Sequence, residues 1–143
     1  MWALGAEFTT GILAKVQCSA LGVKGAADTQ EEAFQQIKVR LLHQLRKQEG
    51  SQLLKDFIDT VRPYEGYGIV FTHEEYLNVY LRYILWRDGI NQTSLAALTG
   101  KTKAQINNIL TGRRAASIRL YSDLLDKLGY KVNITVEEKP CFS

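Results

Sequence analysis

The sequence predicts a mainly α fold of the α+β class: an N-terminal β-hairpin with two helices, a second helical region, and a C-terminal β-strand. Apolar residues recur at helical spacing through the middle of the chain. Residues 1–27 are instead rich in β-forming side chains, and residues 131–137 alternate strictly between apolar and polar. Pro63 and the glycines after it divide the chain into two predicted domains, 1–63 and 64–143.

The composition is that of an ordinary globular protein. Of the 143 residues, 45% are hydrophobic and 23% are charged, and the net charge of +3 is only mildly basic. No apolar run approaches the roughly 20 residues that a membrane span needs, and the N-terminus lacks the layout of a signal peptide. The two cysteines, Cys18 and Cys141, have no CxxC spacing, so we expect no metal site and no disulfide framework. The expected location is the cytoplasm.

The N-terminal region begins with two predicted strands, residues 8–18 and residues 21–25, which are rich in β-forming or alternating side chains. A helix then starts at Thr29. The Thr29 hydroxyl and the Glu32 carboxylate have the spacing of a capping box, in which each accepts from a backbone donor of the helix start. We expect this helix to run to about Gln48.

Two further helices follow. The first is capped by Ser51 and closes at Pro63, because proline cannot continue a helix. Residues 69–71 then form either a short strand or a hydrophobic staple for the next helix. That helix opens with a second capping box, formed by Thr72 and Glu75. It is expected to pack behind the two short helices that come after it.

Residues 89–112 predict two short helices joined by a tight turn. Asn91 is a good N-cap for the first helix, and Gly100 can adopt the positive φ that ends it. Thr102 caps the second helix, and Gly112 stops it. The predicted buried residues are Leu95, Ala96 and Leu98 in the first helix and Ile106, Ile109 and Leu110 in the second.

The spacing within this segment is the most informative feature of the chain. Two helices that cross at a steep angle need a small residue near the bend, and Ala96 lies four residues before the glycine of the turn. This is the helix-turn-helix pattern, and residues 72–128 resemble the Cro/phage-repressor (Xre) family. The Asn91-Gln92 pair is especially similar to the lambdoid repressors, whereas Thr99 replaces the aliphatic residue usual in the family.

Local charge points to the same class of protein. Between Asp88 and Asp123 the sequence has no acidic residue. Its basic residues are Lys101, Lys103, Arg113, Arg114 and Arg119. The second short helix is also polar on the face that its isoleucines leave free, which favours binding to double-stranded DNA. The alternatives are two helices of an ordinary bundle, with Gly100 only a C-cap, or a scaffold for protein contacts.

The resemblance implies a sequence-specific, repressor-like transcription regulator without cofactor or metal. In that family the second helix lies in the major groove, and its N-terminal half reads the bases. The predicted base contacts are Lys103, Ala104, Gln105, Asn107 and Asn108. Cationic side chains and helix N-termini neutralise phosphates and set the register. The predicted phosphate contacts are Asn91, Gln92, Lys101, Thr102, Arg113 and Arg114.

The alternating C-terminal segment predicts a half-buried strand in need of a partner, because unpaired strand edges are a liability. Antitoxins of the HigA and HipB kind, which this ending resembles, often pair such strands across a dimer. The resemblance therefore implies a homodimer on an inverted-repeat operator. Its predicted dimer contacts are Val132, Ile134 and Val136. The alternative is pairing with the N-terminal strands of the same chain.

The N-terminal region supports a second hypothesis. Two strands followed by the acidic helix start at residues 27–33 resemble the beginning of HicB-type antitoxins. This resemblance implies an antitoxin whose residues 1–62 bind a toxin while the helix-turn-helix regulates the operon. An enzyme is not expected, because neither His43 nor His73 has a nucleophile at a recognisable spacing and no glycine-rich phosphate loop is present.

Overall fold

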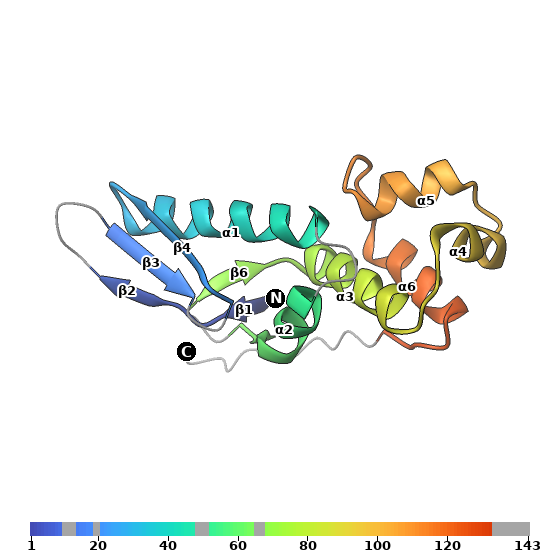
Figure 1. Cartoon of the computed structure of the whole chain (residues 1–143), viewed down its shortest axis with the longest axis horizontal. Helices are drawn as coiled ribbons and strands as arrows, with labels where there is room; N and C mark the ends of the chain where they lie inside the picture. Colours follow the sequence, from blue (N-terminus) through green and yellow to red (C-terminus); the bar gives the residue numbers. More distant parts are fainter. Residues whose placement is uncertain (10–13, 19–20, 48–51, 65–67, 133–143) are drawn as a thin grey trace, which may run out of the picture.

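The computed structural model describes residues 1–9, 14–18, 21–47, 52–64 and 68–132 of the chain. Within these ranges the protein forms six helices and two three-stranded antiparallel sheets (Figure 1). The predicted mainly α, α+β class is therefore confirmed. None of the helices in these ranges combines the length and the apolar character that a membrane span requires.

The elements follow one another in the order β1–β4, α1, α2, β5, β6, α3–α6. The strands are β1 (Trp2–Leu4), β2 (Glu7–Thr9), β3 (Ala14–Cys18), β4 (Val23–Ala27), β5 (Arg62–Pro63) and β6 (Ile69–Phe71). The helices are α1 (Gln30–Lys47), α2 (Gln52–Thr60), α3 (His73–Arg87), α4 (Gln92–Thr99), α5 (Lys103–Leu110) and α6 (Ile118–Lys127).

The first sheet has the order β2-β3-β4, and α1 packs along it (Figure 1). Gly25 allows the close approach, because a Cβ there would lie 2.8 Å from the Gln36 Oε1 atom of α1. The same Gln36 oxygen accepts from the backbone N–H of Ala26 (2.9 Å), and Arg40 donates to the carbonyl of Lys24 (2.9 Å). Side chains of α1 thus satisfy β4 groups that would otherwise lie at an open sheet edge.

The second sheet joins segments far apart in the sequence. Its order is β5-β1-β6, so the first residues of the chain form the central strand. The sequence favours β structure across residues 1–27 but identifies individual strands only at residues 8–18 and 21–25, because three residues such as those of β1 are too few to establish an alternation. Residues 69–71 do form a strand, and Ile69 and Phe71 are buried in the N-terminal core although they follow the predicted boundary at Pro63.

Two hydrophobic cores meet along α3. The N-terminal core includes Leu4, Ile37, Leu41, Leu54, Phe57 and Phe71, and Val79 of α3 joins it. The second core lies between α3 and the three helices after it, and it includes Leu77, Leu81, Leu95, Ile106, Ile109 and Leu124. Because α3 contributes to both cores, the region after it is built directly onto the N-terminal region.

Polar contacts join α1 to α3 as well. The Thr72 capping box is present as predicted, with the Glu75 carboxylate accepting from the Thr72 N–H (3.0 Å) and the Thr72 hydroxyl from the Glu75 N–H (3.1 Å). Lys38 Nζ lies 2.9 Å from Glu75 Oε1. Burial by itself raises the pKa of the Glu75 carboxyl, but the Thr72 N–H and the Lys38 ammonium lower it by more, and the net pKa falls below its ordinary value.

The predicted start of α1 is present in the structure, whereas the predicted cap of α2 cannot be compared with it. The N–H of Glu32 donates to the Thr29 hydroxyl (3.2 Å), so α1 begins where the sequence predicts. The Ser51 cap predicted for α2 lies outside the described residues.

Candidate nucleic-acid interface

The first short helix, α4, begins and ends as predicted. The Asn91 Oδ1 atom accepts from the Ser94 N–H at 2.7 Å, so Asn91 is its N-cap. Gly100 ends the helix in the left-handed region, with φ of 70° and ψ of 18°. A residue with a Cβ adopts this conformation at a cost, which explains glycine at the turn.

The buried face of α4 differs from the prediction at one position. Leu95 and Ala96 are buried as predicted, but Leu98 is 53% exposed, so its assignment to the buried face is wrong. The side chains turned inward are spaced at i, i+3, i+4 and i+7, starting from Gln92, and Leu98 lies outside that arc. Thr99 belongs to the arc, and its hydroxyl donates to the Leu95 carbonyl at 2.8 Å, so this polar residue is accommodated there.

The second short helix, α5, starts with a capping box. The Thr102 hydroxyl accepts from the Gln105 N–H (3.1 Å), and the Gln105 Oε1 atom accepts from the Thr102 N–H (2.9 Å). The three predicted apolar residues Ile106, Ile109 and Leu110 are all buried, at 2% exposure or less. The isoleucine face is therefore turned into the core, and the opposite face is turned to solvent.

The solvent face of α5 carries the residues predicted to read bases. Lys103, Ala104 and Gln105 are exposed, whereas Asn107 and Asn108 are half-buried. The Gln92 side-chain amide of α4 donates to Asn107 Oδ1 at 3.4 Å and so links the start of one helix to the face of the other. None of these α5 side chains is buried in the protein's own core.

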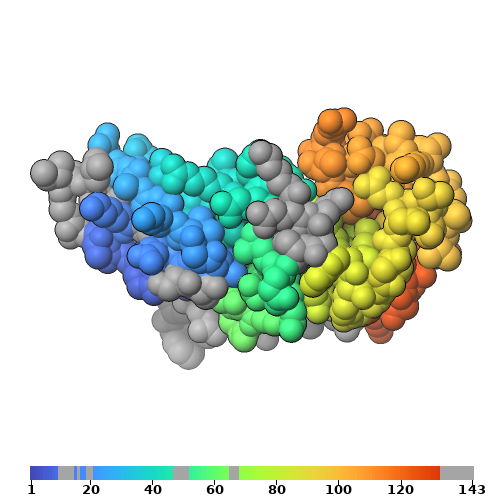
Figure 2. All heavy atoms as spheres, in the orientation of Figure 1, coloured from blue at the N-terminus to red at the C-terminus, as the bar shows by residue number. Residues whose placement is uncertain are grey.

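Basic residues surround this face. Arg113 and Arg114 are exposed in the loop after α5, and the Arg114 N–H donates to the Asn108 carbonyl (3.1 Å), which folds the loop back onto the helix. Lys101 is half-buried in the turn between the helices. In the view of Figure 2, the orange atoms of α5 and its loop form the outer surface at one end of the molecule.

A buried polar side chain fixes the other end of α5. Asn78 of α3 is 8% exposed, and its amide donates to the Ile109 carbonyl (3.1 Å) and to the Tyr121 hydroxyl (3.0 Å). The Leu110 carbonyl lies 3.5 Å from the same nitrogen. Burial raises the pKa of Tyr121 despite this hydrogen bond, so its hydroxyl stays protonated at neutral pH. No local sequence pattern identifies Asn78 and Tyr121 as partners, because the hydrogen bonds of Asn78 span 31 and 43 residues.

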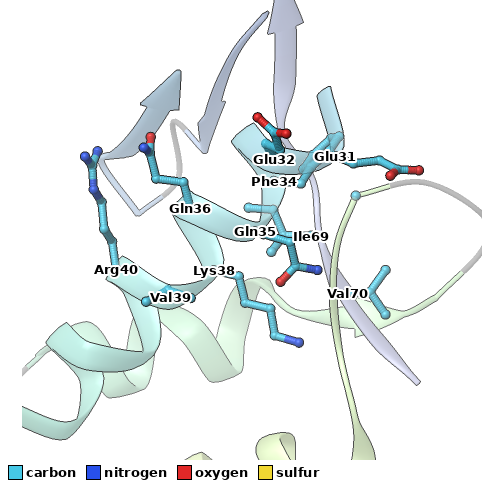
Figure 3. A pocket seen from close by; sticks show the side chains of 11 residues that line it. Glu31, Glu32, Phe34, Gln35, Gln36, Lys38, Val39, Arg40, Ile69 and Val70 are labelled. Carbon is cyan, nitrogen blue, oxygen red and sulfur yellow. The ribbon is translucent and has the colours of Figure 1, made fainter. Parts of the chain in front are cut away.

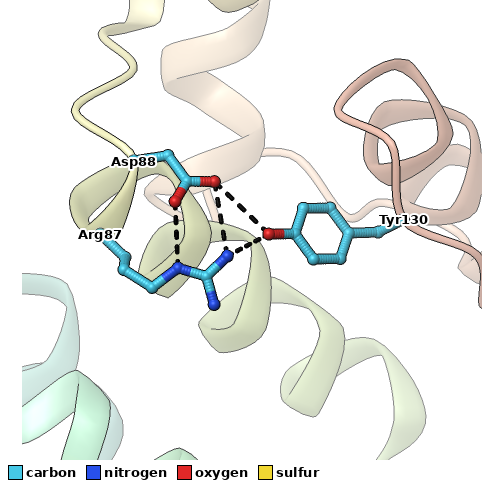
Figure 4. Close-up of polar contacts among 3 residues, drawn as sticks. All are labelled: Arg87, Asp88 and Tyr130. Atoms are coloured by element: carbon cyan, nitrogen blue, oxygen red, sulfur yellow. Dashed lines mark hydrogen bonds and ion pairs between the residues drawn. The ribbon is translucent and has the colours of Figure 1, made fainter.

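Of the three residues predicted to form the dimer contact, only Val132 lies within the described residues. Val132 is half-buried against the second core and is not in a strand, while Ile134 and Val136 lie outside the described residues. Just before them, the Tyr130 hydroxyl contacts both Arg87 and Asp88 at the end of α3 (Figure 4). The hydrogen bond from Arg87 holds the pKa of the Asp88 carboxyl below its ordinary value. These contacts fix the point at which the C-terminal segment leaves α6.

The N-terminal region has a groove whose lining carries both acidic and basic side chains. It lies between α1 and β6, and its volume is about 870 Å³. Its lining mixes acidic Glu31 and Glu32 with basic Lys38 and Arg40, and Figure 3 shows Glu31 and Arg40 toward opposite ends of it. In the described part of the chain, no three His, Cys, Asp or Glu side chains are arranged to hold a metal ion.

Comparison with known protein families gives a match for the region that contains α4 and α5. Residues 81–134 match the family model described as helix-turn-helix, which overlaps the predicted segment 72–128 and starts within α3. The comparison with curated proteins gives no match. The matching segment contains the capped helix pair, the left-handed glycine between them and the exposed polar face described above. Residues 81–134 are therefore a helix-turn-helix domain of the Xre/Cro type, a family of DNA-binding transcription regulators.

Proposed function

We propose that the protein is a repressor-like regulator that binds a specific double-stranded DNA sequence as a homodimer on an inverted repeat. The observation that carries this proposal is the orientation of α5. Its isoleucines are buried and its polar face is open to solvent, next to the exposed arginines of the following loop. An α-helix presented in this way fits the width of the major groove.

The phosphate contacts in this proposal lie on both sides of the helix pair. Lys101, Arg113 and Arg114 supply positive charge, which releases counterions from the DNA backbone. The capped N-termini of α4 and α5, at Asn91 and Thr102, present backbone N–H groups that favour a nearby phosphate. Gln92 would add a side-chain donor at the start of α4, and these contacts set the register of α5 without reading sequence.

The base contacts belong to the N-terminal and central part of α5. Lys103 can donate to guanine O6 and N7, and Asn107 or Asn108 can pair with adenine. Ala104 can contact a thymine methyl group. The Gln105 side-chain oxygen already accepts from the Thr102 N–H, so we propose that Gln105 contacts a base through its amide NH₂.

The dimer proposal rests on the C-terminal segment. Val132 is half-buried beside the second core, and Tyr130 anchors the segment to the end of α3. A strand formed by the residues from Val132 through Ile134 to Val136 would then have to find an edge, either in a second copy or in this chain's own sheets. We propose the second copy, because a two-fold dimer presents two copies of α5 to successive major grooves.

The alternative function keeps the DNA-binding domain and adds a protein partner. In it, residues 1–62 bind a toxin, and the helix-turn-helix region regulates the operon. Size-exclusion chromatography with the product of a neighbouring gene tests it directly. A stable complex formed through the N-terminal region would favour the antitoxin, and separate elution would favour the regulator alone.

Two substitutions test the assignment of readout and phosphate contacts. We expect Lys103→Ala to weaken binding to the preferred operator by about 1–3 kcal/mol and to relax the preference at one base position. Arg113→Ala should instead weaken binding to all sequences alike and reduce the dependence of affinity on salt. Fluorescence anisotropy titrations with the operator and its single-base variants distinguish them. If both substitutions weakened every duplex equally, Lys103 would not be a base contact.

A further inference from the structure

The C-terminal end of α1 lies against the loop that follows α5. Gly112 and Arg46 are far apart in the sequence, yet a Cβ on Gly112 would lie 2.7 Å from Arg46 Nη2 and 2.9 Å from its Cζ. The guanidinium therefore sits directly on the glycine backbone. Figure 1 shows the end of α1 on the same side of the molecule as α5.

The fold holds Arg46 in this place through several contacts of α1. The Arg46 carbonyl accepts from Arg82 Nη2 at 2.6 Å, and Arg82 is a buried residue of α3. Two turns earlier on α1, Lys38 pairs with Glu75 at the start of α3. Leu42, between Lys38 and Arg46 at i+4 spacing, packs against the N-terminal core. The position of Arg46 relative to the helix-turn-helix is thus set by packed structure.

The local charge at this contact is positive. Arg46 and Arg114 line the same hollow, and Arg113 is the neighbouring loop residue. Glu74 and Glu75 also line the hollow, but Glu75 is already bound to Lys38 and to the Thr72 N–H. Among the residues that the structure describes, no carboxylate forms an ion pair with Arg46. Two guanidinium groups, those of Arg46 and Arg114, therefore share the hollow with one carboxylate that is not paired with a lysine, that of Glu74.

We propose that Arg46 binds a DNA phosphate beyond the C-terminal end of α5, so that the N-terminal region contributes to the DNA interface. The inference rests on the proposed function. Arg46 is exposed, and its planar guanidinium matches the geometry of a phosphate. It also lies outside the segment 81–134 that matches the helix-turn-helix family, so the contact would be an addition to the domain.

A purely structural role for Arg46 is the alternative to be excluded. α1 and α5 both end near this point, and a cation near helix C-termini is favourable by itself. A structural role would change the thermal stability of the protein and would leave the salt dependence of DNA binding unaltered. A phosphate contact has the opposite signature, because each neutralised phosphate contributes about 0.9 to the slope of log affinity against log salt.

The test measures binding of the full chain to a DNA duplex at several salt concentrations by fluorescence anisotropy. It compares wild type with Arg46→Gln, Arg46→Lys and Arg113→Gln. Lys55→Gln is the matched control, because it removes one exposed charge from α2, which lies low in the middle of Figure 1, whereas α5 lies at the upper right. Thermal unfolding of each variant reports the fold.

We expect Arg46→Gln to reduce the salt slope by about 0.9, as Arg113→Gln does, and Arg46→Lys to retain most of it. Lys55→Gln should bind like the wild type. A wild-type slope for Arg46→Gln, with a reduced slope for Arg113→Gln, would overturn the Arg46 contact and leave the proposed function intact. Equal losses for Lys55→Gln and Arg46→Gln would also overturn it, since they would reflect net charge alone. Absence of binding by the wild type would overturn the proposed function itself.

Discussion

Replacing Ile106 with alanine is expected to lower the free energy of unfolding by about 2–5 kcal/mol. The Ile106 side chain is fully buried between the helices of the second core, where it packs with Leu95 and Leu81. Alanine would leave a cavity at the joint that sets the angle between α4 and α5. Chemical denaturation followed by circular dichroism measures the change.

The control for this experiment is Lys103→Ala on the same helix. Lys103 is exposed, so its replacement should change stability by less than about 0.5 kcal/mol while weakening operator binding. The two substitutions therefore separate the buried face of α5 from its solvent face. Unfolding of Ile106→Ala at the same denaturant concentration as the wild type would mean that this isoleucine is not in the core.

The Asn78→Leu substitution is expected to lower the free energy of unfolding by about 1–3 kcal/mol, although leucine and asparagine are similar in size. The substitution removes the donor to the Ile109 carbonyl and to the Tyr121 hydroxyl, and both acceptors lie in a buried setting. The carbonyl at the end of α5 would then lose a partner that anchors it to α3. Thermal or chemical unfolding measures the loss.

A double-mutant cycle with Tyr121→Phe locates the effect. Tyr121→Phe removes only one of the acceptors of Asn78, so we expect a smaller change than for Asn78→Leu. If the two residues interact, the double substitution should destabilise the protein by less than the sum of the single changes. Strict additivity would show that the Asn78–Tyr121 hydrogen bond contributes nothing to stability.

Local signals allowed much of the helix-turn-helix to be predicted from the sequence. Asn91 and Thr102 cap their helices through side chains that bond within three residues, and Gly100 adopts the left-handed conformation that its type permits. Helical spacing identified Ile106 and Ile109 as buried, because apolar residues three positions apart lie on the same face of a helix. The roles of the exposed α5 residues in reading DNA stay a prediction.

Other features depend on contacts between distant segments, so no local pattern signals them. The strand β1 is recognisable only through its pairing with β5 and β6, more than fifty residues later. Leu98 fits a helical apolar stripe in the sequence, but the rotation of α4 against its neighbours decides exposure, and it leaves this leucine in solvent. The contact of Arg46 with Gly112 likewise exists only because α1 ends beside the α5 loop.

The central claim is that α5 lies along the major groove with its polar face toward the bases. Selection of bound duplexes from a random oligonucleotide pool at physiological salt tests it most directly. We predict enrichment of an inverted repeat whose half-sites lie about 10 base pairs apart, centre to centre, and a changed preference when the selection is repeated with Lys103→Ala. A pool without any enriched sequence, or the same sequences enriched by wild type and by a variant with alanine at positions 103, 107 and 108, would contradict the claim.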